Sequence, residues 1–554
     1  MIKRILIALA VAAGLMTVSS CSGLLDMQPT SSVSDMTIWE TTENAEYNVN
    51  YLYSYLIDIV NGQTKLGMSE SLTDMFKYCS YQYNKEALVP SEFSYGGSTI
   101  DAGYVDSYMG VWGMLYTAIR KVNQAIYGLH NYGKMSEVDM NRLEAELRLL
   151  RGGMYFELAK RYGDVILYDE DITAITKDKA LSKEEDVWDF IYADLNYAAE
   201  TLPAKAEARG RLDKGMAYAY ITRTMLYAKR WDLVIAAADK VTELGYALTA
   251  NYADSYQKPI NGGNTEAILQ YTFSYSDGIT HSMDSRFCPG GDHADLGNSG
   301  NGGIGVPTQE LVESYELADG GFPDWEPWHS ESGTVQTPPY AYLEPRFHAT
   351  ILYNGSDWKG RKVEPFVGGK DGWAAWRLET SPSGKTVTGY YLRKLLDEGN
   401  VELLGSDSPI TIIRYAEVLL NKAEACYQKK DLKGANDCVR AIRARVGLPY
   451  TDKAGNDLWN AIRQERKVEL AMEGFWYWDL RRWRVAHEDY SNGGLSNYQQ
   501  HGLKIEKDAD GRFVYTYVSV DDKNRNFPEQ LYRFPLPESE YNTNDLVEQY
   551  EEWK

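Results

Sequence analysis

Apolar residues at helical spacing recur along most of this chain, and they constrain its fold more than any other feature. Segments 213–229 and 232–245 each carry such a stripe and are separated by a short turn. Segments 411–429 and 432–445 repeat the arrangement later in the chain. Helices joined by so short a connection pack antiparallel against each other. The sequence therefore predicts a mostly α fold built on helix hairpins.

The two hairpins share a pattern of small residues where the helices cross and an aromatic residue near the turn. That pattern resembles tetratricopeptide repeats, although the period is imperfect and long insertions separate the pairs. We therefore expect a tetratricopeptide-like helix-hairpin scaffold rather than a regular solenoid. Further helices are predicted at 43–60, 105–130, 136–162, 183–201 and 456–482.

The segment between the two hairpins has a different composition. Residues 249–404 are rich in Gly, Pro, Asn, Ser, Tyr and Trp, and they lack helical periodicity. A structureless loop of this length is improbable inside a compact domain. We therefore expect a large loop-rich lobe with short strands, for example near 267–273 and 347–353. The prediction is a single domain over 39–554, whose scaffold comprises 39–248 and 405–554 and whose ligand lobe is 249–404.

The first residues have the pattern of an export signal. Lys3 and Arg4 precede a short apolar run, and Val18-Ser19-Ser20-Cys21 resembles a bacterial lipobox. This predicts a signal peptide over 1–20, a lipid on Cys21 that holds the protein on a membrane, and a tether over 21–38. The alternative is a secreted protein whose new N-terminus is an ordinary cysteine.

Charge and cysteine usage exclude several classes of function. The chain has 57 basic and 79 acidic side chains and a formal net charge of −22, which argues against a nucleic-acid partner. The later cysteines, Cys79, Cys288, Cys426 and Cys438, form no CxxC pair and have no metal-ligand spacing. We therefore predict no metal and no cofactor. Cys426 and Cys438 lie on neighbouring predicted helices and could pair, but buried free thiols are favoured.

Several stretches, distributed in order over nearly the whole chain, resemble the SusD-like (SusD/RagB) outer-membrane lipoproteins of Bacteroidetes. Ile166 departs from the pattern, because a proline usually follows the Tyr-Gly-Asp-Val motif. The stretches are CSGLLD at 21–26 with QPT at 28–30, LRLLRGGMYFELAKRYGDV at 147–165, LEPRFHATILYN at 343–354, TGYYLRK at 388–394, IRYAEVLLNKAEA at 413–425, GFWYWDLRRW at 474–483 and FPLPESE at 534–540.

The resemblance implies a location and a function. SusD-like proteins are lipid-anchored at the outer membrane and face the cell exterior. They capture oligosaccharide or polysaccharide and form a lid on a TonB-dependent, SusC-like barrel. Two alternatives stay open: the same fold capturing peptides, and a surface glycan hydrolase. GxSxG, HExxH and Walker motifs are missing from the sequence, while its many acidic side chains keep a catalytic carboxylate pair open as an alternative.

Binding residues are expected on loops that a rigid scaffold supports. The resemblance implies two such regions, 66–104 and the loop-rich lobe, where aromatic faces would stack on sugar rings and polar groups would bind hydroxyls. For any one of these aromatic residues, packing in the core is an equal alternative. The candidates are Asp74, Phe76, Tyr78, Tyr81, Tyr83, Arg286, Phe287, Trp325, Trp328, Trp358 and Trp373.

Other aromatic and charged residues are predicted to be structural. The aromatic run 475–483 follows an amphipathic helix and is expected in the core. Arg346 and Arg393 are expected to form internal ion pairs. On the helix predicted at 456–482, Arg466 and Glu469 are three residues apart and are expected to pair on one face, as are Asp479 and Arg482.

Overall fold

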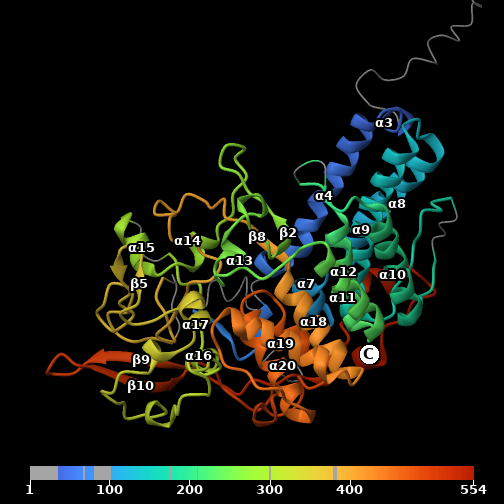
Figure 1. Ribbon diagram of the computed structural model, residues 1–554. Coiled ribbons are helices and arrows are strands. Elements are labelled where there is room, and N and C mark those ends of the chain that lie inside the picture. The colour runs from blue at the N-terminus through green and yellow to red at the C-terminus, as the bar shows by residue number, and fades with distance from the viewer. Residues whose placement is uncertain are drawn as a thin grey trace, which may run out of the picture.

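The computed structural model has a helical body on one side and a loop-rich lobe on the other (Figure 1). The predicted signal peptide, Cys21 and most of the tether lie outside the described residues. Across the described part of the chain, no helix is both long enough and apolar enough to span a bilayer. The structure describes residues 35–65, 69–79, 102–173, 178–206, 208, 210–297, 301–378 and 384–554.

The N-terminal half of the scaffold consists of long helices. In α9 the side chain of Ser136 accepts a hydrogen bond from the Asp139 amide at 3.2 Å and so caps the first turn. Gly163, at φ 70°, ends the same helix as predicted. The helices are α4 (Thr42–Lys65), α7 (Ala102–Met109), α8 (Trp112–Tyr132), α9 (Glu137–Tyr162), α10 (Glu184–Thr201), α11 (Lys214–Tyr227) and α12 (Trp231–Glu243).

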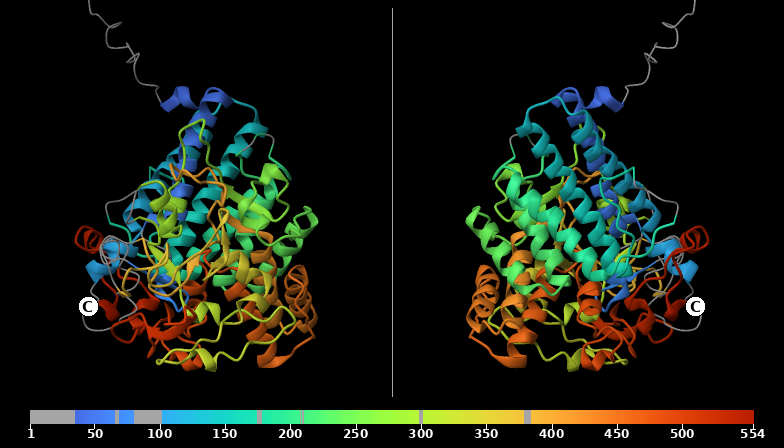
Figure 2. Two further views of the ribbon diagram at one scale, coloured as in Figure 1. Left: turned by 90° about the vertical axis from the view of Figure 1, so that its left-hand side faces the viewer. Right: turned by 90° about the vertical axis from the view of Figure 1, so that its right-hand side faces the viewer.

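The C-terminal half supplies the second predicted hairpin. Helix α18 packs against α11 and α12, so the two hairpins are neighbours although they are far apart in sequence. Both views of Figure 2 show the green and orange helices side by side. Cys426 and Cys438 are buried free thiols, as favoured. The elements are β8 (Ile410–Arg414), α18 (Tyr415–Gln428), α19 (Leu432–Arg445), α20 (Gly455–Glu469) and α21 (Trp476–Arg482).

Three predicted helices differ from the structure. The helix expected at 105–130 is broken between α7 and α8, where Gly110 has no room for a Cβ against the Asp106 carbonyl oxygen. The helix expected at 456–482 is two helices, because Met472 and Gly474 adopt positive φ between them. The helix expected from 411 begins at Tyr415, because the β-branched residues before it form strand β8.

The lobe contains short antiparallel pairs of strands, as predicted. Strand β1 (Phe76–Tyr78) pairs with β3 (Gly305–Pro307), and β2 (Ala267–Tyr271) pairs with β8 of the scaffold. The strand expected at 347–353 is reduced to β4, because Pro345–Thr350 forms helix α17. The other pairs are β4 (Ile351–Leu352) with β7 (Tyr391–Leu392), and β5 (Asp357–Trp358) with β6 (Arg361–Lys362).

A long hairpin near the C-terminus was not predicted. Strands β9 (His501–Lys507) and β10 (Phe513–Ser519) pair in register from His501 with Ser519 to Lys507 with Phe513. The hairpin belongs to the range assigned to the scaffold, yet it extends beside the lobe in Figure 1, and Tyr515 forms a bridge with Thr334. The remaining short α-helices are α3 (Asp35–Ile38), α13 (Asp254–Gln257), α14 (Met283–Phe287), α15 (Gly290–Asp295), α16 (Gln309–Val312) and α22 (Glu538–Tyr541).

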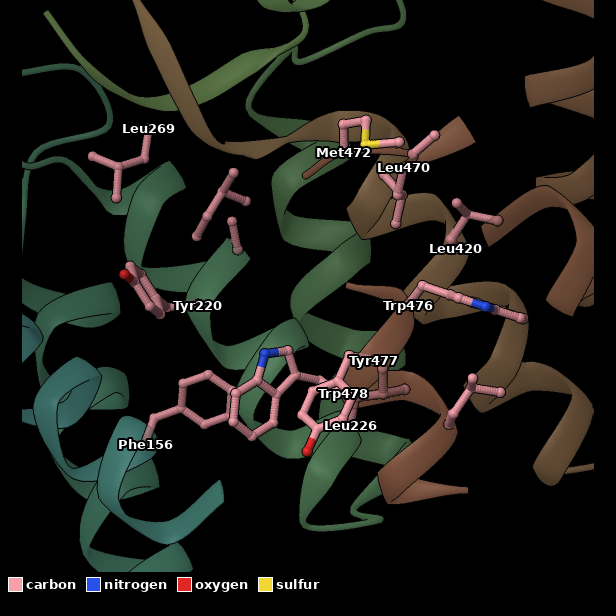
Figure 3. Close-up of a cluster of buried hydrophobic side chains, with 14 of the residues drawn as sticks. Phe156, Tyr220, Leu226, Leu269, Leu420, Leu470, Met472, Trp476, Tyr477 and Trp478 are labelled. Atoms are coloured by element: carbon pink, nitrogen blue, oxygen red, sulfur yellow. The ribbon is translucent and has the colours of Figure 1, made fainter. Parts of the chain in front are cut away.

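One large hydrophobic core runs through the scaffold and into the lobe. Figure 3 shows a part of it, where Phe156 of α9, Tyr220 of α11 and Leu420 of α18 converge on the aromatic run of α21. Trp476, Tyr477 and Trp478 are buried there, as predicted, whereas Phe475 and Trp483 of the same run are only partly buried. The predicted pair Asp479–Arg482 forms, whereas Arg466 pairs with Asp479 rather than with Glu469.

Candidate ligand-binding site in the loop-rich lobe

Asp74 lies in the turn before β1 and is 3% exposed. Its carboxylate accepts hydrogen bonds from Lys467 Nζ at 2.7 Å, from Trp476 Nε1 at 3.1 Å and from the Tyr490 hydroxyl at 3.1 Å. All three donors belong to the C-terminal half of the chain. In this structure Asp74 therefore fastens the first candidate segment to the scaffold.

The two candidate segments meet at a cluster of buried rings. Phe76 contacts Tyr78 edge to face with ring centroids 5.6 Å apart, and it contacts Phe287 of α14 at 6.1 Å. These three side chains are at most 5% exposed. The structure thus brings the first segment and the lobe together, but it places these rings in the core of the contact. Tyr81 and Tyr83 lie outside the described residues.

Trp325 and Trp328 form an edge-to-face pair in the short 3-10 helix η3 (Glu326–Trp328) and the residue before it. Trp328 donates from Nε1 to the Gln336 carbonyl at 2.9 Å, and the two indoles are 4–6% exposed. Trp325 Nε1 is buried and has no hydrogen-bond partner in the described part of the chain. The pair packs beneath the surface of the lobe.

Trp358 is held by an ionic cluster. Its Nε1 donates to Asp292 at 2.8 Å, and Asp292 accepts from Arg361 at 2.6 Å. Arg361 also binds Asp371 at 2.7 Å. Although burial opposes the charged guanidinium, the two carboxylates raise the pKa of Arg361 above its usual value. The Asp292 carboxylate therefore binds cationic side chains of the lobe, and Trp358 is 1% exposed.

Two candidates, Arg286 and Trp373, remain partly exposed. Trp373 donates from Nε1 to the Thr386 carbonyl at 3.0 Å, which fixes the indole while leaving part of it at the surface. The Arg286 guanidinium forms no ion pair or hydrogen bond with any residue that the structure describes. The Arg286 carbonyl accepts from the Ile304 amide at 3.0 Å, which anchors its backbone to the segment leading into β3. These two side chains are available to a ligand without repacking.

A further aromatic residue at the surface of the lobe, Tyr275, lies outside the list of candidates. Tyr275 is 51% exposed, and its hydroxyl donates to the Gly405 carbonyl. Asn400 donates to Asp284 at 2.9 Å and to the same carbonyl at 2.5 Å. These contacts join two loops more than a hundred residues apart in sequence, so no local pattern identifies them. The prediction that each candidate contacts ligand stays a prediction, and burial gives most of them a packing role in this conformation.

The fold defines a class: helical-hairpin proteins that carry one large loop-rich insertion between two pairs of helices. The chain belongs to the SusD family, whose family model matches residues 265–553, just over half of its length. A second family model, described as starch-binding and associating with the outer membrane, matches residues 25–226.

Curated relatives and solved structures are similar to this chain over nearly its whole length. A SusD-like protein of Bacteroides ovatus is 25% identical over 97% of this chain and 96% of its own length. A crystal structure of a SusD-like protein from Bacteroides fragilis is 28% identical, covers 95% of this chain and all of its own, and has a TM-score of 0.78. A second structure from that organism, described as a SusD-like carbohydrate binding protein, is 25% identical, covers 92% of this chain and all of its own, and has a TM-score of 0.73.

Proposed function

We propose that this protein binds oligosaccharide or polysaccharide at the cell surface without cleaving it and passes it to a TonB-dependent, SusC-like outer-membrane barrel. The observation that carries the proposal is the full-length likeness to a structure described as a SusD-like carbohydrate binding protein. The partly exposed aromatic and polar groups of the lobe support it. The family-model description of a protein that associates with the outer membrane supports the location.

The proposed binding mechanism is stacking combined with hydrogen bonding. The partly exposed Trp373 ring covers the apolar face of one sugar ring, while Arg286 and Tyr275 bind hydroxyl groups of the ligand. Stacking of a nucleic-acid base on an aromatic side chain is worth roughly 1–3 kcal/mol, which sets an upper scale for each sugar ring. Because the lobe rests on a rigid helical body, these groups are positioned before ligand arrives.

Anchoring completes the proposal. A lipid on Cys21 holds the chain in the outer leaflet, and the tether over 21–38 lets the body move as a lid above the barrel. Replacing Cys21 with Ala would release the protein from the cell surface and leave glycan binding in solution unchanged. Retention of the Cys21→Ala variant at the surface would contradict the anchor.

Calorimetry of the purified full-length chain in detergent, titrated with neutral oligosaccharides and with peptide digests, tests the ligand class. We expect heat from at least one glycan, and loss of that heat in a Trp373→Ala variant. Tyr342→Ala is the matched control, because Tyr342 is also in the lobe and is 70% exposed. Binding of peptides alone would overturn the proposal, and release of reducing ends from the bound glycan would show hydrolysis.

A further inference from the structure

A pocket lies on the helical scaffold, away from the candidate site, and none of its lining residues belongs to the lobe. Its volume is about 360 Å³, and its walls come from α11, α12, α18, α20 and the end of α21. This volume falls within the range of about 300–1,000 Å³ that is usual for small-molecule sites. We call it the scaffold pocket.

Aromatic rings form the walls of the scaffold pocket. Trp459 stacks on Tyr427 with centroids 5.2 Å apart and planes at 24°, and it meets Trp483 at 5.3 Å and 73°. The two indoles therefore make a corner, and Trp231 lines the pocket from the first residue of α12. All four rings are only partly buried. Such rings present flat apolar surface to a ligand.

Arg463 lines the same pocket and has no anionic partner among the residues that the structure describes. Within that part of the chain its Nε is buried without a hydrogen-bond acceptor, and Nη2 makes one long bond of 3.3 Å to the Gly493 carbonyl. Its guanidinium lies 5.3 Å from the centroid of the Trp483 ring. Burial lowers the pKa of Arg463, because no carboxylate among the described residues binds its guanidinium.

Arg482, in the same pocket, forms the bidentate pair with a carboxylate that is usual for an arginine. Its two Nη atoms donate to Glu424 at 2.5 and 2.7 Å, and the carboxylate also accepts from Trp483 Nε1 at 3.1 Å. Glu424 is thus fully engaged and does not reach Arg463. Arg463 is only partly buried, but the buried Nε of its guanidinium lacks such a carboxylate partner among the described residues, and an anion from outside would supply the acceptor.

We propose that the scaffold pocket binds a sugar ring that bears a carboxylate, such as a uronic acid within an oligosaccharide. The ring lies in the corner formed by Trp459 and Trp483, and the carboxylate accepts hydrogen bonds from Arg463. A peptide ligand fits less well, because the lining comes from helices and the turns that follow them and offers no strand edge for a peptide backbone to extend. The site goes beyond the proposed lobe function and does not depend on it.

The test compares tri-galacturonate with its methyl ester, which has the same rings but no charge. Both are titrated into the full-length chain in detergent, with tryptophan fluorescence and calorimetry as readouts. We expect the acid to bind about 10- to 100-fold more tightly than the ester, the scale of a charge-assisted hydrogen bond. Arg463→Gln should bind the acid and the ester with equal affinity, and Arg463→Lys should keep part of the preference for the acid. Added salt should lower the affinity for the acid and leave that for the ester unchanged.

Two further variants make the result decisive. Trp231→Ala should lower the affinities for the acid and for the ester by the same factor, because it removes a wall of the pocket and leaves Arg463 in place. Arg120→Gln, which removes an exposed arginine of α8 that does not line the pocket, should change neither affinity. The proposal is overturned if the ester binds as tightly as the acid, if Arg463→Gln binds like the unaltered chain, if Arg120→Gln abolishes the preference, or if a peptide carboxylate competes equally.

Discussion

Two buried regions of the molecule, the part of the scaffold core drawn in Figure 3 and the joint between scaffold and lobe, are built largely from different chemistry. Inside the scaffold, apolar side chains from α9, α11, α18 and α21 fill the space between helices (Figure 3). At the joint, the hydrophobic core continues into the lobe, but many of the buried groups are guanidinium and carboxylate groups. Apolar contacts depend on how completely the side chains fill the space between helices, whereas ionic contacts depend on the direction of each hydrogen bond.

Arg346 of the lobe illustrates the joint. It binds Glu344 at 2.6 Å within the lobe, and it binds Glu465 at 2.6 Å and Glu469 at 3.2 Å on α20. From the scaffold side, Arg414 binds Glu266 of the lobe at 2.7 Å and also Glu469 at 2.6 Å. Further pairs that cross the joint are Arg443–Glu316, Arg445–Glu266 and Lys394–Glu473.

This difference bears on how the lobe is held. A buried ion pair adds little net stability compared with good apolar packing, but losing one partner leaves an uncompensated charge. Bidentate pairs also fix orientation, because each guanidinium accepts only one arrangement of its carboxylates. We infer that the joint sets the position of the lobe, whereas the apolar core supplies most of the scaffold's stability.

The largest effect is expected from breaking the joint with Arg346→Met. Three buried carboxylates lose their shared cation, and the free energy of unfolding should fall by roughly 3–5 kcal/mol. Urea denaturation followed by circular dichroism measures the change. Arg120→Met is the control, because Arg120 is exposed; its effect should stay within about 0.5 kcal/mol. If the two variants lost equal unfolding free energy, the ion pairs of the joint would matter no more to stability than an exposed arginine, contrary to this prediction.

The apolar side of the comparison is tested by Leu420→Ala on α18. Leu420 is fully buried, so the change leaves a cavity and should cost about 2–5 kcal/mol. Because no charge is exposed or buried, the loss should be the same at pH 5 and at pH 7. A loss that depends on pH would show that ionic contacts control this part of the core as well.

Sequence patterns predicted the scaffold well because its contacts are local. Helix α19 occupies the predicted residues 432–445, and α9 begins and ends within one residue of its predicted bounds. The helices predicted across 472–474 and over 411–414 were wrong, because the conformations of these residues depend on neighbours distant in sequence. The positive φ of Met472 carries no local signal, and β8 needs its partner β2.

The candidate site could be predicted only in part. Aromatic content identified the lobe but could not separate surface from core: Trp358 is 1% exposed, whereas Trp373 is partly exposed. The difference comes from the partner of Trp358 Nε1, Asp292, which is distant in sequence. The internal pairing expected for Arg346 is confirmed, whereas Arg393 pairs with Glu398 at a more exposed position.

Acid should weaken the joint more than the apolar core. Burial alone would raise the pKa of Glu473, but Arg414 and Lys394 outweigh it and hold that pKa below the usual value. Glu469 is lowered in the same way against its burial by Arg445, Arg414 and Arg346. A carboxyl whose pKa is lower in the folded state stabilises the protein above its unfolded pKa, and that stability is lost as pH falls.

The expected result is a fall of about 1–3 kcal/mol in the free energy of unfolding between pH 5 and pH 3, since each unit of pKa shift is worth about 1.4 kcal/mol. Glu344 acts in the opposite direction, because burial raises its pKa above that of a free glutamate despite Arg346. Urea denaturation at a series of pH values measures the slope. Glu473→Gln should reduce it, and a slope unchanged by that variant would exclude this carboxylate as a source.

The smallest effect on stability is expected at the surface of the lobe, where Trp373→Ala should change the free energy of unfolding by about 1–2 kcal/mol. The indole is only partly buried, and the one hydrogen bond that it loses is to the carbonyl of Thr386, which is a buried residue. The same variant should weaken glycan binding by about tenfold or more if one ring stacks on it. Calorimetry and urea denaturation on one preparation separate the two quantities. Because Trp373 is not a partner in the ion pairs of the joint, a ligand site on the lobe can change while the lobe keeps its place. A large loss of stability with unchanged binding would assign Trp373 to the core instead.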